Sequence, residues 1–377
     1  MASLDNYLPR PGLSIPIVTI LDAQGRVLED QQRALVRFAI QDGRGADIIF
    51  AVGTTGEWDR IDNLRRQTVA RIAVEECRIA NRTLTKRVEA WVGVTAPTRA
   101  ETIENLAVAV ELDADAAVVA PLSITDAEQP AAFVEREMGA VFEKLGHKIP
   151  VFLYDNAEIA APGKAAHLHT RDVKQMSRLD YVRGIKVTAS KTVLGNYTRA
   201  ASNFKLAHEF AIYAGNAHLI FDLFARPAGF AEAMRYRWNR YWTQRTLPHG
   251  VVAGPANPMP REWQRGWQVC RAGDRELMSR YAKAVDDFRA ASTFVRRGKD
   301  YKPTIACLKA ALKELGVCSS DAVGAGTPEL SAEERREFAA RWRALRERLA
   351  ATLEPGWVSE LDSRPPGAGL RVAHQNG

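Results

Sequence analysis

Eight short apolar segments, each followed by enough chain for a helix, constrain the fold of this 377-residue chain more than any other feature. Several are continuously hydrophobic and β-branched, which is typical of parallel strands buried on both faces. They lie at residues 12–21, 47–53, 88–95, 116–122, 150–154, 182–188, 210–215 and 250–254. Eight such units over about 250 residues predict an α/β fold, a (β/α)8 TIM barrel.

An open, doubly wound sheet is the other arrangement of alternating strands and helices. It normally has a glycine-rich phosphate turn after its first strand. Residues 20–27, ILDAQGRV, follow the first strand here and do not have the G-x-G-x-x-G pattern. The barrel is therefore the favoured prediction.

The strand pattern stops after the eighth segment, so a C-terminal helical extension should follow the barrel. We predict a barrel over residues 10–272, C-terminal helices over 273–318, and an additional helix with a flexible tail over 321–377. Ser331 and Glu334 have capping-box spacing, so the additional helix should begin there. Its apolar positions share one helical face, which indicates docking on the rest of the protein. These positions are Phe338, Trp342, Leu345 and Leu349.

An Arg-, Trp- and Tyr-rich segment at about 226–245 is inserted in the barrel, and the chain carries a net charge of +7. Such a segment could bind single-stranded nucleic acid. It is more typical of an amphipathic helix with packed aromatic rings and solvated arginines, so we expect no nucleic-acid partner. It should rise on the catalytic face, either as a lid or subunit contact that selects a second substrate, or as an elongated seventh helix.

The chain has the features of a cytoplasmic protein. Its first residues lack a basic start followed by an apolar run, and no apolar stretch approaches the roughly 18–20 residues of a membrane span. Its four cysteines lie far apart without a C-x-x-C pair, which indicates reduced thiols, and its seven histidines have no metal-ligand spacing. We therefore expect no membrane association and no metal site.

Catalytic residues of a barrel lie at the C-terminal ends of its strands. The sixth strand carries Lys186 within the apolar stretch GIKVTAS. A lysine that points into the barrel is desolvated, which favours the neutral amine that can attack a carbonyl and form a Schiff base. The alternative is a solvated lysine at the end of a strand.

Two further strand ends carry candidate groups. Tyr154 closes the fifth strand and could move protons between a substrate and an amine, or simply have its ring in the core and its hydroxyl at the rim. After the second strand, the stretch GTTGE places Gly53 beside the hydroxyls of Thr54 and Thr55. Its backbone N–H groups and hydroxyls could hold a carboxylate or phosphate, or the stretch could be only a tight turn.

Together these motifs resemble the dihydrodipicolinate synthase / N-acetylneuraminate lyase family. GTTGE, the Tyr-Asx pair at 154–155 and GIK at 184–186 occur in the family's order. The resemblance extends over 88–129 and over 302–316, KPTIACLKAALKELG, which is similar to the family's C-terminal helix. It covers roughly residues 12–316, and it implies a class I pyruvate-type aldolase on a (β/α)8 barrel.

The resemblance also implies roles for individual residues. Lys186 would form an imine with a 2-oxo acid, and Tyr154 would shuttle protons. Thr54 and Thr55 would hold the carboxylate with local backbone amides, and Gly215 matches a glycine that lines the pocket. No organic cofactor or metal is implied, because the covalent lysine imine supplies the electrophile. The family's habit suggests a homotetramer, with a dimer as the other possibility.

Three positions depart from the family's pattern. Ile159 stands where the synthases have an arginine that binds the carboxylate of the second substrate. Ser123 occupies the place of a tyrosine that completes a proton relay across a subunit interface, and Val187 replaces an acidic residue often found after the lysine. We therefore expect lysine biosynthesis not to be the function, and a pocket floor less polar than in the best-known members.

The sequence thus predicts a Schiff-base-forming carbon–carbon lyase, an aldolase that joins or cleaves pyruvate (or a near relative) and an aldehyde. One alternative is a sugar-acid dehydratase or hydratase-aldolase that uses the same imine. Another is a non-catalytic 2-oxo-acid-binding protein. The identity of the aldehyde is left open.

Overall fold

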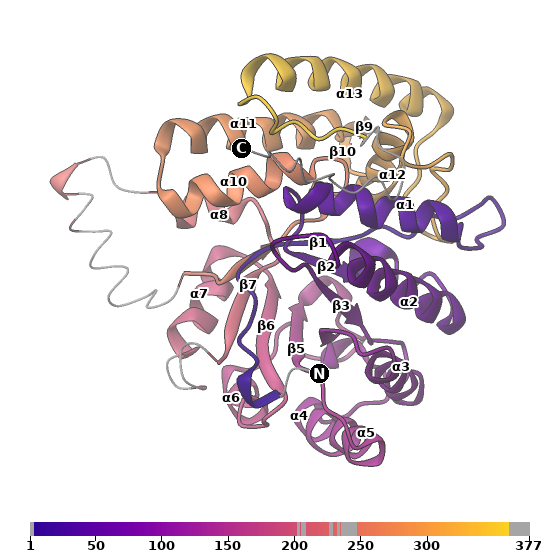
Figure 1. The fold of residues 1–377 in the computed structure, drawn as a ribbon, viewed down its shortest axis with the longest axis vertical. Coiled ribbons are helices and arrows are strands. Elements are labelled where there is room, and N and C mark those ends of the chain that lie inside the picture. The colour runs from indigo at the N-terminus through magenta and orange to yellow at the C-terminus, as the bar shows by residue number, and fades with distance from the viewer. Residues whose placement is uncertain are drawn as a thin grey trace, which may run out of the picture.

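Eight parallel strands close into a barrel in chain order in the computed structural model, which describes residues 4–201, 204, 209–225, 229–231, 234 and 247–361 (Figure 1). The strands are β1 (Gly12–Pro16), β2 (Ile48–Ala51), β3 (Glu89–Gly93), β4 (Ala116–Val119), β5 (Val151–Asn156), β6 (Val182–Thr188), β7 (Ala211–Ala214) and β8 (Gly250–Val252). β8 pairs with β1 and closes the barrel. The predicted (β/α)8 architecture is confirmed.

Helices surround the barrel, and the C-terminal ones gather on one side of it (Figure 1). The barrel helices are α1 (Glu29–Ile40), α2 (Asn63–Ala80), α3 (Arg99–Glu111), α4 (Pro130–Ala132), α5 (Gly139–Leu145), α6 (Thr170–Met176), α7 (Lys191–Ala200) and α8 (Leu219–Leu223). They are followed by α10 (Pro260–Ala272), α11 (Arg275–Ala291), α12 (Thr304–Glu314) and α13 (Ala332–Thr352). The apolar faces of these helices form a continuous core with the outward-facing side chains of the strands.

The interior of the barrel is filled by aromatic rings. Trp91 stacks on Phe152 with ring centroids 4.0 Å apart, and Tyr213 meets Trp91 edge-on at 5.0 Å. Gly184 leaves the necessary space, because a Cβ there would lie 2.8 Å from the Phe152 ring and 2.4 Å from the carbonyl oxygen of Ala211. The aromatic layer therefore separates the polar groups at the two ends of the barrel interior.

A buried carboxylate lies at the opposite, N-terminal end of the barrel. Glu89 accepts hydrogen bonds from Trp91 Nε1 at 2.9 Å and from the Tyr7 hydroxyl at 3.2 Å. Burial raises the pKa of Glu89 from 4.5 to about 7, although these two donors oppose the shift. The segment before β1 thus covers the floor of the barrel through a group that holds its proton in the folded state.

Glu89 should make the folded protein less stable as the pH rises. Between pH 4.5 and about 7 the unfolded chain releases this proton while the folded state retains it, so the free energy of unfolding falls by about 3 kcal/mol across this window. Glu89→Gln keeps an acceptor for both donors and should remove this loss, as measured by urea unfolding at several pH values. The exposed Glu111→Gln is the matched control, and parallel pH profiles for Glu89→Gln and the wild type would contradict the prediction.

The C-terminal helix α13 begins as the sequence predicts. Ser331 and Glu334 form the capping box, and the helix packs on α11 and α12. Its predicted apolar stripe is fully buried, at 0–2% exposure. This stripe comprises Phe338, Trp342, Leu345 and Leu349. The helix is therefore an integral part of the fold.

One element was missed: the region after the barrel is not entirely helical. A two-stranded hairpin pairs β9 (Phe294–Arg296) with β10 (Lys299–Tyr301). Its turn places Arg297 and Gly298 at φ values of 51° and 73°, the left-handed pair that a tight hairpin requires. Three-residue strands are too short to produce a recognisable alternation of apolar residues.

Three other expectations concern the inserted segment and the tail, the cysteines, and membrane association. Most of the Arg- and Trp-rich segment at 226–245, and most of the predicted tail, lie outside the described residues. The four cysteines are all free and buried. Within the described part of the chain, no helix is both long and apolar enough to cross a membrane.

Candidate active site

Lys186 lies inside the barrel near the C-terminal end of β6 and is only 5% exposed. The register pairs it with Tyr154 on β5, so both side chains point to the same interior face. Its Nζ lies 3.8 Å from the centre of the Tyr154 ring and 5.1 Å from that of Phe50. The structure thus brings the predicted amine and phenol together in an apolar setting.

The Tyr154 hydroxyl is the centre of a small hydrogen-bond network. It lies 3.1 Å from Thr54 Oγ1, with either oxygen able to donate. Asn156 Nδ2 donates to it at 3.1 Å and Thr188 Oγ1 donates at 3.5 Å. Residues from β5, β6 and the loop after β2 therefore converge on one phenol oxygen.

This network changes the acidity of Tyr154. Burial by itself would raise the pKa of its phenol, but the Lys186 charge and the hydrogen bonds of Thr188, Thr54 and Asn156 together lower it below 10.0. Burial raises the pKa of the other buried tyrosines of the described chain, which are Tyr181, Tyr197, Tyr213 and Tyr281. Tyr154 is set apart from them because its pKa is shifted downward instead of upward.

The loop after β2 is a single turn of 3-10 helix, Thr54–Gly56, with Gly53 at its start. Within the described structure, the backbone N–H groups of Thr54 and Thr55 have no hydrogen-bond partner, as is usual for the first turn of a helix. The Thr55 side chain lies against Gly254, where a Cβ would be 3.1 Å from its hydroxyl. Two hydroxyls and two free amides are thus available in this turn, and the Thr54 hydroxyl contacts Tyr154.

The same loop is held in a strained backbone conformation. Val52, just before Gly53, has φ of 59°, which is unfavourable for a β-branched residue by about 1–3 kcal/mol. Gly93 allows this, because a Cβ there would lie 2.2 Å from the carbonyl oxygen of Val52. On the other side, Thr19 Oγ1 donates to the carbonyl of Gly56 at 2.7 Å. Such strain requires strong surrounding contacts, and the Thr54 hydroxyl that contacts Tyr154 lies two residues further along the chain.

Gly215 supports the network from the end of β7. Its N–H donates to the carbonyl of Val187 at 2.7 Å. A Cβ at this position would lie 2.1 Å from Thr188 Oγ1. The glycine therefore leaves room for the hydroxyl that reaches Tyr154, and no contact joins it to Lys186 directly.

The three departures from the family pattern have different surroundings. Ser123 is 5% exposed, and its hydroxyl has no hydrogen-bond partner among the residues that the structure describes. Ile159 packs on the interior cluster that includes Tyr154. The interpretation of Val187 as part of the pocket floor was wrong: alternation along β6 turns it outward, where it joins the core under the helices.

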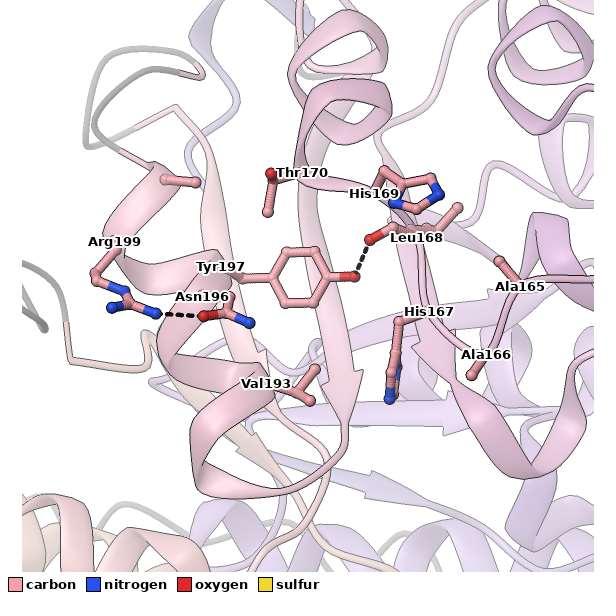
Figure 2. A pocket seen from close by; sticks show the side chains of 11 residues that line it. Ala165, Ala166, His167, Leu168, His169, Thr170, Val193, Asn196, Tyr197 and Arg199 are labelled. Atoms are coloured by element: carbon pink, nitrogen blue, oxygen red, sulfur yellow. Dashed lines mark hydrogen bonds between the residues drawn. The ribbon is translucent and has the colours of Figure 1, made fainter.

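A hollow of about 660 Å³ lies on the outer side of the barrel, between the loop 165–170 and α7 (Figure 2). Asp155, next to Tyr154 but facing outward, fixes this loop by accepting from Leu168 N at 2.8 Å and by contacting His167 Nδ1 at 2.7 Å. The Tyr197 hydroxyl donates to the carbonyl of Leu168 at 2.6 Å. The two members of the Tyr-Asx pair thus have different contacts: Tyr154 faces Lys186 inside the barrel, and Asp155 anchors the loop outside it.

Three residues of the site were not predicted from the sequence. Asn156 and Thr188 each lie two positions beyond a predicted residue on the same strand, so strand alternation could have identified them. No sequence pattern distinguishes Phe50, because apolar residues are expected at every position of a buried strand. In the part of the chain that the structure covers, no group of three His, Cys, Asp or Glu side chains could hold a metal ion.

Comparison with known proteins gives consistent matches. The model of the dihydrodipicolinate synthetase family matches residues 10–228. The chain is 27% identical over 279 residues to 4-hydroxy-tetrahydrodipicolinate synthase of Methylococcus capsulatus, covering 73% of this chain and 81% of the relative. It is 30% identical over 176 residues to that of Thioalkalivibrio sulfidiphilus, covering 46% of this chain and only 54% of the relative's own length.

Two solved structures share the fold. Sialic acid aldolase of Ruminococcus gnavus superposes with a TM-score of 0.69 at 15% identity, covering 91% of this chain and 99% of that one. A prophage protein of the dihydrodipicolinic acid synthase family from E. coli K12, solved in complex with pyruvate, gives 0.66 at 20% identity, with coverages of 89% and 98%.

The closed barrel and its lysine-bearing C-terminal face define an enzyme scaffold of the aldolase and lyase class. The chain belongs to the dihydrodipicolinate synthetase family, whose model matches more than half of it.

The Asn156 amide should set the acidity of Tyr154. Asn156→Ala removes an N–H donor that stabilises the phenolate, so the pKa of Tyr154 should rise. The test is an alkaline titration followed by phenolate absorbance, in which the step absent from Tyr154→Phe belongs to Tyr154. That step should move to higher pH in Asn156→Ala and stay in place in the control Tyr197→Phe. An unchanged step in Asn156→Ala would contradict the prediction.

Proposed function

We propose that the protein forms an imine between Lys186 and the ketone of a 2-oxo acid such as pyruvate, and that it makes or breaks the adjacent carbon–carbon bond with an aldehyde. The observation that carries this proposal is the pairing of Lys186 with Tyr154 inside the barrel, 3.8 Å from Nζ to ring centre. An almost fully buried amine beside a phenol of lowered pKa supports nucleophilic attack with proton transfer.

The proposed cleavage proceeds in balanced steps. The neutral Nζ adds to the ketone carbon, and Tyr154 gives its proton to the leaving hydroxyl, so the carbinolamine loses water to become a protonated imine and Tyr154 becomes a phenolate. Tyr154, as phenolate, takes the proton of the 4-hydroxyl, the carbon–carbon bond breaks, and its electron pair moves into the imine to leave an enamine. The aldehyde departs, the enamine carbon regains a proton, and water releases the 2-oxo acid from Lys186. Synthesis is the same sequence in reverse.

The loop after β2 is suited to the carboxylate of the 2-oxo acid. The hydroxyls and free N–H groups of Thr54 and Thr55 offer several donors on one side of Tyr154. Because Thr54 also contacts the phenol, the carboxylate and the proton carrier would share one hydrogen-bond network. A 2-oxo acid bound in this way would have its ketone on the side of Tyr154 that Lys186 faces.

The activities named for the related proteins are consistent with this chemistry. The curated relatives are synthases, one solved neighbour is a sialic acid aldolase, and another was solved in complex with pyruvate. The second substrate of this chain should differ from that of the synthases, since Ile159 presents an apolar side chain against the interior cluster. An aldehyde without a carboxylate at that point fits this surface best.

Borohydride trapping tests the imine. Incubation with pyruvate and reduction should add one reduced pyruvate to Lys186, found by peptide mass analysis, and Lys186→Met should abolish it. Lys191→Met, an exposed lysine at the start of α7, is the matched control and should leave the adduct unchanged. Tyr154→Phe should slow carbon–carbon cleavage by about 10²- to 10⁴-fold. Absence of an adduct with pyruvate and every other 2-oxo acid tried would remove the proposal.

The product separates cleavage from the alternatives. Release of an aldehyde from a 4-hydroxy-2-oxo acid, measured with a coupled reductase, supports the aldolase. An adduct accompanied by loss of water and no aldehyde would favour a dehydratase, and an adduct with no turnover would favour a binding protein.

A further inference from the structure

A buried ion pair joins the Thr54–Thr55 loop to the C-terminal part of the chain. Glu57 directly follows this loop and Lys309 lies on α12, with 0% side-chain exposure for both and Nζ 2.5 Å from Oε2. Glu57 adopts the left-handed φ of 59°. The pair connects residues 252 positions apart, at the end of the loop opposite to Tyr154.

The remaining partners of the pair all come from one segment, residues 318–327. Glu57 Oε1 accepts from Gly324 N at 2.6 Å and from Thr327 Oγ1 at 2.8 Å. Lys309 Nζ also donates to the carbonyl of Ala322 at 2.8 Å. The carboxylate therefore receives three donors, and its position is determined entirely by α12 and this segment.

The segment 318–327 fits tightly against the barrel. A Cβ at Gly324 would lie 2.7 Å from Arg60 Cβ, and Ala322 forms an isolated bridge with Leu21. Ser320 Oγ donates to the carbonyl of Leu21 at 2.5 Å. The segment is thus anchored on the loop after β1 as well as on the loop after β2.

A buried ion pair adds little net stability, because the cost of desolvating both charges offsets their attraction. The same pair does restrict the geometry of the groups that carry the charges. The Glu57–Lys309 pair specifies the geometry of the loop after β2. In this loop Val52 has a strained backbone and Thr54 contacts Tyr154. Without Lys309, nothing in the described structure would neutralise Glu57, and the turn would be free to relax.

We infer that Glu57 and Lys309 are positioning residues: through them, residues 318–327 hold Thr54 and Thr55 in the geometry that binds the carboxylate of the 2-oxo acid. The inference rests on the proposed function and assigns the C-terminal segment a role in substrate binding. Neither residue touches the reacting atoms.

The first test is amide hydrogen exchange of the full-length protein. Lys309→Met should speed exchange of the amides at 52–57 about tenfold or more, while the amides of β6 remain as in the wild type. The matched control is Arg346→Met, which breaks another contact of the C-terminal helices to a buried carboxylate, Glu262, away from the loop. Exchange at 52–57 that is unchanged in Lys309→Met, or equally faster in Arg346→Met, would overturn the inference.

The second test separates binding from chemistry. In Lys309→Met the pyruvate concentration that gives half-maximal borohydride trapping should rise about 10- to 100-fold, while the rate at saturating pyruvate changes little, because a carboxylate contact acts on ground and transition states alike. Arg346→Met should leave both values unchanged. A fall in the saturating rate alone would overturn the inference.

A double variant excludes a purely structural effect. Glu57→Leu with Lys309→Met removes both charges and the acceptor for Gly324 and Thr327, so no buried charge is left unpaired. The loop still lacks its contacts with the C-terminal segment, and half-maximal trapping should still need more pyruvate. Return of the wild-type concentration dependence in this variant would overturn the inference. If the wild type itself forms no adduct, the proposed function fails, and hydrogen exchange still decides whether the pair holds the loop.

Discussion

The placement of Lys186 beside Tyr154 is the constraint on which the rest of the structure depends. Both side chains occupy the interior of a closed barrel, where water has little access and an amine can be stabilised only by neighbours on adjacent strands. Below them Trp91, Phe152 and Tyr213 fill the barrel, so the amine cannot withdraw toward the floor. A small substrate must therefore meet it from the C-terminal side.

The acidity of Tyr154 follows from the same geometry. A buried phenol is normally a weaker acid, and the other buried tyrosines of the described chain show this effect. At Tyr154 the Lys186 charge and the donors Asn156 and Thr188 reverse it. These donors all belong to this chain. The Tyr154 phenol is thus supplied with hydrogen-bond partners by this chain alone.

Much of the fold could be predicted from the sequence because each strand is marked by a short apolar segment of its own. Continuous apolar runs revealed the eight strands, and β6 was predicted to the residue at 182–188. Lys186 and Tyr154 could be predicted as candidates because the C-terminal strand ends of such barrels carry catalytic groups. Val187 was misjudged, although alternation alone turns it outward. The Glu57–Lys309 pair had no local signal, since its members lie 252 positions apart and charged residues are normally expected in solvent.

The residues proposed for imine formation and the residues proposed to contact the second substrate lie in different parts of the site. The groups for imine formation lie on β5, β6 and the loop after β2, and each is held by contacts of its own: glycines at 184 and 215, strain at Val52, and the ion pair behind the loop. The positions that differ from the family, Ser123 and Ile159, lie outside this set. Changes there can alter the second substrate without disturbing the amine, because no hydrogen bond within the described structure links them to Lys186 or Tyr154.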